Sequence, residues 1–185
     1  IQYNEPKLKV MGLEIVRSST PAPVRKALKD TVGIVLKGDE MTLRQYVKDL
    51  EKTWHSLPPE EIAFPRSVNG MDKYRDKATL YKKGTPIHVV GALIYNYLLD
   101  QKGIGNKYQK IQEGDKIKFL YLKEPNIIGS HVITFQGEIP PEFHLDEYID
   151  YDKMFEKSFL DPLSTLVGCV GWKVKQEATL EGLFG

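Results

Sequence analysis

Hydrophobic positions recur at helical spacing over two stretches in the first third of the chain. The first lies between Pro21 and Gly38, and its apolar positions are Val24, Ala27, Leu28, Val32, Val35 and Leu36. Thr20 can cap a helix that holds Pro21 in its first turn, and Gly38 can end that helix. The second stretch runs from Met41 to Trp54 and stops before two prolines. The pattern predicts two helices that pack as an antiparallel pair.

Alternating patterns predict strands in three other places. Residues 7–17 alternate with a break at Gly12, which predicts a strand with a kink or bulge. A single strand cannot bury its face alone, so this one should complete a sheet made by other residues. The second pattern sets Ile117, Phe119 and Tyr121 against Lys116, Lys118 and Leu120 and predicts a half-buried strand, which residues 132–135 continue as a short sheet. Lysines on its outer face suit either DNA contact or protection of an exposed sheet edge.

The stretch from Tyr81 to Asn96 reads Y-K-K-G-T-P-I-H-V-V-G-A-L-I-Y-N. Two lysines precede a Gly-Thr-Pro turn and a long apolar run, which predicts a buried element with two cations at its mouth. Gly91 within the run would let another backbone or a ligand approach closely. The alternative is a loop that enters a core strand or helix and carries two solvated lysines. Residues 95–99 predict a helix.

The last strongly patterned segment runs from Asp146 to Leu166 and is rich in aromatic residues at helical spacing. We predict a closing helix with a structural role, which Pro162 either kinks or divides into two segments.

Composition describes a globular chain whose charge is sorted by segment. The 185 residues are 41% hydrophobic, which suffices for a real core in one or two domains. Lys and Arg number 26 against 25 Asp and Glu, yet residues 64–83 are mainly basic and residues 136–161 mainly acidic. Such sorting suits a protein that grips a polyanion with one face, although loops that alternate by chance would look similar.

One segment carries groups that bind phosphates and sugars rather than bases, and a second segment carries a cluster of cations. In the segment from Ala63 to Tyr74, short polar groups and an exposed amide at Ser67, Asn69 and Gly70 accompany Arg66, Lys73 and Tyr74. The alternative there is a plain Asn-Gly turn. Arg17, Arg25, Lys26 and Lys29 cluster where the first helix begins, and the alternative for them is a solvated helix face.

Two motifs carry a resemblance to a known family. The runs G-L-E-I-V-R-S-S-T-P at residues 12–21 and K-G-T-P-I-H-V-V-G-A-L-I-Y-N at residues 83–96 resemble the family B DNA polymerases, specifically the T4-like phage replicative group. The resemblance covers nearly the whole chain. It implies an α+β fold: a mainly helical thumb domain with a small antiparallel sheet, preceded by one or two strands of the palm. Residues 1–20 would end the palm, 21–175 would form the thumb and 176–185 a clamp-binding peptide.

The resemblance also implies residue roles and partners. The DNA-binding residues would be Arg17, Arg25, Arg66, Ser67, Asn69, Lys73, Tyr74, Lys82, Lys83, Lys173 and Lys175. The clamp-binding residues would be Leu180, Leu183 and Phe184, which a single helical turn places on one side. Partners would be a larger chain carrying exonuclease, fingers and palm, primer-template DNA, and the sliding clamp. The expected location is the cytoplasm of the infected bacterial host.

Catalytic constellations are absent from the sequence. The paired aspartates through which the family holds its metal ions are missing, so we predict that this chain alone is inactive and binds no metal or cofactor, with Mg²⁺ expected in the complete polymerase. His144 and Asp146 are too few for a metal site, and Cys169 has neither a disulfide partner nor an adjacent base. No membrane span is expected. Because the chain starts at Ile1, we expect a split subunit or a fragment; a stand-alone nucleic-acid-binding or scaffold protein is the alternative.

Overall fold

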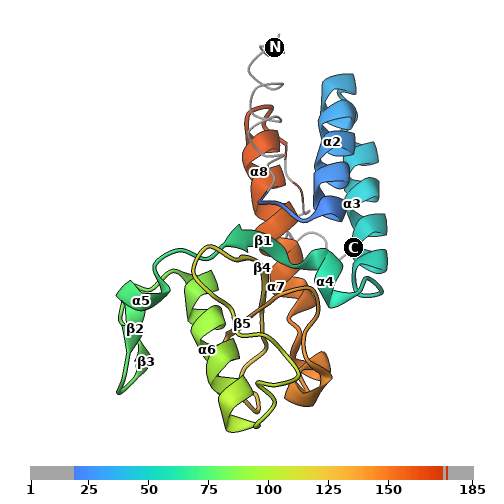
Figure 1. The fold of residues 1–185 in the computed structure, drawn as a ribbon. Coiled ribbons are helices and arrows are strands. Elements are labelled where there is room, and N and C mark those ends of the chain that lie inside the picture. Colours follow the sequence, from blue (N-terminus) through green and yellow to red (C-terminus); the bar gives the residue numbers. More distant parts are fainter. Residues whose placement is uncertain (1–18, 173, 175–185) are drawn as a thin grey trace. The chain divides into compact units, whose positions relative to one another are not determined.

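The computed structural model describes residues 19–172 and residue 174 (Figure 1). The chain divides into two units. Among the described residues, unit 1 contains residues 23–56 and those from 155 onward, and unit 2 contains residues 19–22 and 57–154. Helices and a small antiparallel sheet occur together, which confirms the predicted α+β class. The predicted strand at residues 7–17 and the predicted peptide at 176–185 lie outside the described residues.

Unit 1 contains the predicted pair of helices, α2 (Ala22–Lys37) and α3 (Glu40–Trp54). Gly38 has a φ of 77°, the left-handed conformation that ends α2. The Asp39 carboxylate accepts a hydrogen bond from the Thr42 amide at 3.0 Å and caps α3. The two helices lie side by side, and the Tyr46 hydroxyl donates to Asp30 across them at 2.8 Å. Since only two residues connect them, they are antiparallel, as predicted.

The predicted closing helix is interrupted. Residues Asp146–Tyr148 form a separate 3-10 turn, η2, and α7 begins only at Tyr151 (Tyr151–Phe155). The backbone at Ile149 is extended because it forms a bridge with Leu122 beside the sheet. A π-helical turn, η3 (Glu156–Leu160), leads into α8 (Asp161–Gly168), whose first turn holds Pro162. The prediction of one helix from residue 146 was therefore wrong, because helical backbone is continuous only over residues 151–168, and Pro162 lies within that stretch at the first turn of α8.

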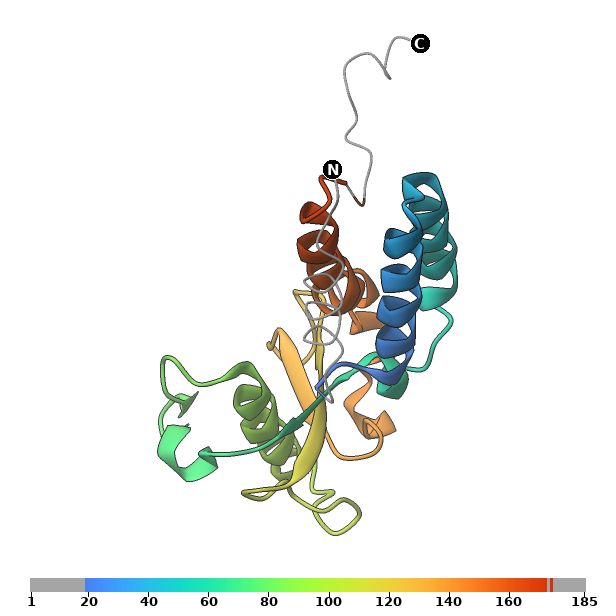
Figure 2. The same cartoon turned by 90° about the horizontal axis from the view of Figure 1, so that it is seen from above.

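Unit 2 is built on a three-stranded antiparallel sheet of order β1-β4-β5. Its strands are β1 (Phe64–Ser67), β4 (Lys116–Tyr121) and β5 (Val132–Phe135). Helix α6 (Ile87–Gln101) packs against β5, and in Figure 2 this green helix lies alongside the strands. A Cβ atom at Gly91 would lie 2.7 Å from the Thr134 backbone nitrogen, so the helix and strand approach closely there. The predicted close approach at Gly91 is confirmed, and the apolar run that contains it is a helix.

The predicted alternation of β4 holds only over its first half. Ile117 and Phe119 are buried, but Leu120 on the other face is also fully buried and Tyr121 is half-buried. The reason is that both faces of β4 are covered. Helix α6 contacts the Phe119 face, where the His88 and Phe119 ring centres lie 6.3 Å apart, and residues 59–62 contact the other face, where the Lys118 ammonium donates to the Glu60 carbonyl. Alternation therefore misplaced Leu120 on a solvent-exposed face.

Short elements complete unit 2. Helix α4 (Pro59–Ile62) precedes β1, and α5 (Met71–Tyr74) precedes a two-stranded hairpin of β2 (Arg75–Asp76) and β3 (Leu80–Tyr81). A 3-10 turn, η1 (Pro141–Phe143), follows the sheet.

Candidate nucleic-acid interface

The first cationic region of unit 2 is the segment 71–83, which we call the basic hairpin. It comprises α5, β2, β3 and the two lysines that follow them, and Figure 1 shows it projecting away from α6 and the sheet. Its cations are Lys73, Arg75, Lys77, Lys82 and Lys83, all of which are exposed. The backbone amides of Ala78 and Thr79 donate to the Asp76 carboxylate at 2.8 and 2.9 Å, and these bonds lower the pKa of that carboxyl. The turn is thus ordered by one carboxylate while its cations stay in water.

Local contacts orient two of the predicted DNA-binding lysines. The Lys82 ammonium donates to the Lys73 carbonyl at 2.8 Å, and the Lys82 amide donates to the Tyr74 carbonyl at 2.9 Å. The Lys73 ammonium lies 5.0 Å from the centre of the Tyr74 ring. An ammonium has three N–H donors, so Lys82 keeps donors for a ligand. Lys73, Tyr74, Lys82 and Lys83 are therefore brought together on one short element.

The turn before α5 differs in detail from the sequence interpretation. Gly70 has a φ of 88°, as an Asn-Gly turn allows, and Asn69 is exposed. The amides of Gly70 and Met71 donate to the Glu113 carboxylate at 2.5 and 2.9 Å. The backbone amide that we considered for phosphate binding is therefore occupied by a carboxylate of the same unit.

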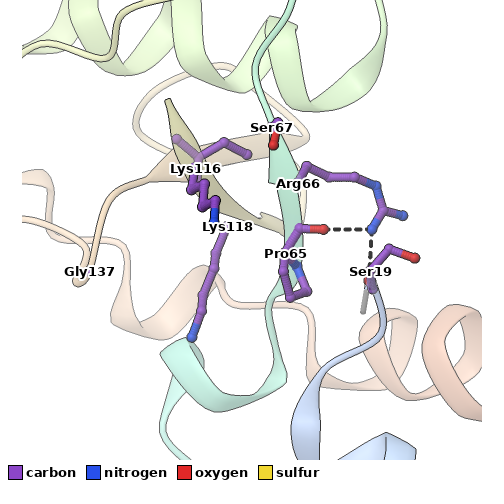
Figure 3. Close-up of a pocket in the computed structure, with 8 residues that line it drawn as sticks. Ser19, Pro65, Arg66, Ser67, Lys116, Lys118 and Gly137 are labelled. Atoms are coloured by element: carbon purple, nitrogen blue, oxygen red, sulfur yellow. Dashed lines mark hydrogen bonds between the residues drawn. The ribbon is translucent and has the colours of Figure 1, made fainter. Parts of the chain in front are cut away.

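The second cationic region is a groove of about 530 Å³ on the ribbon formed by β1 and β4. Its lining residues are Ser19, Pro65, Arg66, Ser67, Lys116, Ile117, Lys118 and Gly137 (Figure 3). Ser67 and Lys116 are exposed, and the Lys118 ammonium donates to the Glu60 carbonyl at 2.9 Å. Neither Lys116 nor Lys118 was among the predicted site residues, although the alternating lysines of this strand were the signal for them.

Arg66 is engaged within unit 2. Its Nη1 atom donates to the Ser19 and Pro65 carbonyls, both at 2.7 Å. The guanidinium carbon lies 5.4 Å from the Phe64 ring centre and 5.5 Å from that of Phe119. Burial of the guanidinium lowers the pKa of Arg66 from its ordinary value. Arg66, the arginine of the predicted segment, thus contacts protein groups of its own unit.

The remaining predicted site residues lie in unit 1 or outside the described residues. Arg25 lies on α2 in unit 1, where its Nε atom is buried without a hydrogen bond to the described part of the chain. The predicted residues Arg17, Lys173, Lys175, Leu180, Leu183 and Phe184 lie outside the described residues.

Metal ligands, the cysteine and apolar helices are described for residues 19–172 and 174. Within this range, no group of three His, Cys, Asp or Glu side chains is arranged to hold a metal ion. Cys169 is half-buried, and its sulfur lies 3.8 Å from the Thr165 carbonyl oxygen. No helix in the same range is long and apolar enough to cross a membrane.

Comparison with known proteins finds two phage DNA polymerases that are similar to this chain over its length. No protein-family profile matches it. The DNA-directed DNA polymerase of Enterobacteria phage T4 is 33% identical over 188 aligned positions, which cover 100% of this chain and 20% of that protein. The corresponding protein of Escherichia phage RB69 is 35% identical over 187 positions, covering 99% of this chain and 20% of its own length.

These matches show which proteins the chain is related to. The chain is homologous to DNA-directed DNA polymerases. More narrowly, it corresponds to one region of the T4-like phage polymerases, which confirms the resemblance found in its motifs. The chain spans about a fifth of the length of these relatives.

Proposed function

We propose that this chain is the thumb part of a phage replicative DNA polymerase, present as a split subunit or a fragment, that grips primer-template duplex DNA. The observation that carries the proposal is the similarity of the whole chain to the T4 and RB69 polymerases. The exposed cations of the basic hairpin support it, because cations on an ordered turn can neutralise phosphates without reading bases.

The remaining chemistry would belong to a larger chain with the exonuclease, fingers and palm. That chain would hold the Mg²⁺ ions and carry out nucleotidyl transfer, and the present chain alone would be inactive. Leu180, Leu183 and Phe184 would tether the enzyme to the sliding clamp by inserting into an apolar groove. The enzyme would work in the cytoplasm of the infected bacterial host.

The test is duplex binding as a function of salt. Replacing Lys73, Lys82 and Lys83 together by Gln should weaken binding on the order of a hundredfold near 0.1 M salt and lower the slope of log affinity against log salt by about 2 to 3, for any DNA sequence. The matched control replaces three exposed lysines outside both cationic regions, Lys48, Lys102 and Lys123, by Gln. Equal effects of the two triple variants, or a strong sequence preference, would refute the proposal.

A further inference from the structure

The ribbon formed by β1 and β4 has two sides with different side chains. Directly opposed residues of an antiparallel pair share a side, and successive residues alternate. Arg66 opposes Ile117, whereas Ser67 opposes Lys116. The Arg66 side chain therefore lies on the side opposite to Ser67 and Lys116. Figure 3 shows it directed toward Ser19 and away from Lys116 and Lys118.

On its own side, Arg66 is held by four contacts. Two carbonyls accept from its Nη1 atom, and its guanidinium lies over the rings of Phe64 and Phe119, which stack on each other. Ser19 is 47 residues away in sequence and lies in the short segment of unit 2 that leads directly into α2. A planar guanidinium can stack on aromatic rings while its N–H groups donate to carbonyls. A lysine ammonium is a compact point charge and cannot stack on rings. Arg66 thereby fastens the segment at residues 19–22 to the edge strand β1, and we call this arrangement the clasp.

On the other side, donors remain available. Among the described residues, neither the Lys116 ammonium nor the Ser67 hydroxyl has a hydrogen-bond or ion-pair partner, and both are exposed beside the groove. Lys118 differs because Glu60 already accepts from its ammonium. Phosphodiester oxygens accept hydrogen bonds from lysine ammonium groups and serine hydroxyls of this kind.

We propose that Ser67 and Lys116 bind a backbone phosphate of duplex DNA where the groove borders their side of the ribbon, and that Arg66, which lines the groove from the other side, is a positioning residue that fastens Ser19 to β1 without contacting DNA. The proposal rests on the proposed DNA grip and divides its cations into two roles. It changes the interpretation of Arg66 and adds Lys116 to the contact residues.

The experiment compares single variants of the full chain by salt-dependent duplex binding and by amide hydrogen exchange. Lys116→Gln should lower the salt slope by about one, as loss of one phosphate contact does, and should leave exchange unchanged. Arg66→Gln and Arg66→Lys should both leave the salt slope unchanged. Both variants should accelerate exchange at the Ser19 and Thr20 amides about tenfold. Arg66→Lys should do so although it keeps the positive charge, because lysine lacks the planar guanidinium that lies over the rings and donates to both carbonyls.

Three outcomes would overturn the assignment. If Arg66→Gln lowers the slope by about one and Arg66→Lys restores it, Arg66 is a phosphate contact. If Lys116→Gln leaves the slope unchanged, the groove is not the site. If exchange rises throughout unit 2 in the Arg66 variants, Arg66 stabilises the unit generally and is no clasp. Failure of the unsubstituted chain to bind duplex DNA would instead refute the proposed function and the groove assignment together, while exchange would still judge the clasp.

Discussion

The basic hairpin and the β1–β4 ribbon both carry cations, but they hold them differently. In the hairpin, the contacts of Lys82 and Lys73 reach residues at most nine positions away, and the ammonium groups stay exposed. In the ribbon, Arg66 reaches a carbonyl 47 residues away and Lys118 one 58 residues away. Long-range contacts thus occupy donor groups of cations that the sequence alone would suggest are equally free to bind a phosphate. The number of cations in a segment therefore overstates its capacity for a polyanion.

The largest expected effect comes from a substitution that should destabilise the unit that carries both regions. In Gly91→Ala, the added Cβ would collide with the Thr134 backbone where α6 packs on β5. Overpacking against a backbone atom belongs at the upper end of the usual cost, about 3 kcal/mol, and the roughly 1 kcal/mol gained in helix propensity offsets only part of it. We expect the free energy of unfolding to fall by about 2 kcal/mol in urea titrations.

The control for this substitution is Gly105→Ala, because no atom lies within 4 Å of a Cβ built at Gly105. Equal stability of the two variants would show that the helix and sheet of unit 2 tolerate a wider spacing than the structure indicates.

A smaller effect should be confined to the hairpin. Asp76→Ala removes the carboxylate that accepts from the Ala78 and Thr79 amides. We expect faster hydrogen exchange at these two amides and weaker duplex binding, since the hairpin cations lose their ordered support, while exchange in β4 stays unchanged. Asp76→Asn, which keeps one acceptor oxygen, should show a smaller change. Loss of protection in β4 as well would mean that hairpin and ribbon are not independent.

The smallest effect should be a pH dependence of stability that arises at His88, a residue of α6 whose ring faces Phe119 of the ribbon. Burial, and secondarily the nearby Arg66 charge, lower the pKa of His88 from its ordinary value of 6.5. A group whose folded-state pKa is lowered in this way binds its proton more readily when unfolded. Its stabilising contribution is therefore complete above pH 6.5 and is lost as the pH falls from 6.5 toward the lowered value.

Urea titrations at pH 7.5 and pH 5 should show this loss, and His88→Gln should abolish it. The Glu142 carboxylate accepts hydrogen bonds from Lys107 and Tyr108, which lower its pKa to about 2. The stability that ionised Glu142 contributes is therefore lost at a lower pH than the two compared. An unchanged pH dependence in the His88 variant would show that another group titrates.

Local sequence determined the elements whose signals lie within a few residues. The periodicity of residues 24–36 and 41–54, together with Gly38 as a stop, was enough for the helical pair, because helical faces and caps depend on near neighbours. The alternation of Lys116 to Phe119 was enough for a strand, and the bare backbone of Gly91 was enough for a close approach.

Tertiary structure decided whatever depends on pairing between distant residues. The packing of residues 59–62 on the second face of β4 buries Leu120, and the bridge from Leu122 to Ile149 breaks the closing helix. The register of β1 against β4 puts Ser67 beside Lys116 and turns Arg66 toward Ser19. Patterns along a chain report on which face a residue occupies, but not on which distant carbonyl or ring meets it there. For that physical reason the chemistry of Arg66 became visible only in the folded chain.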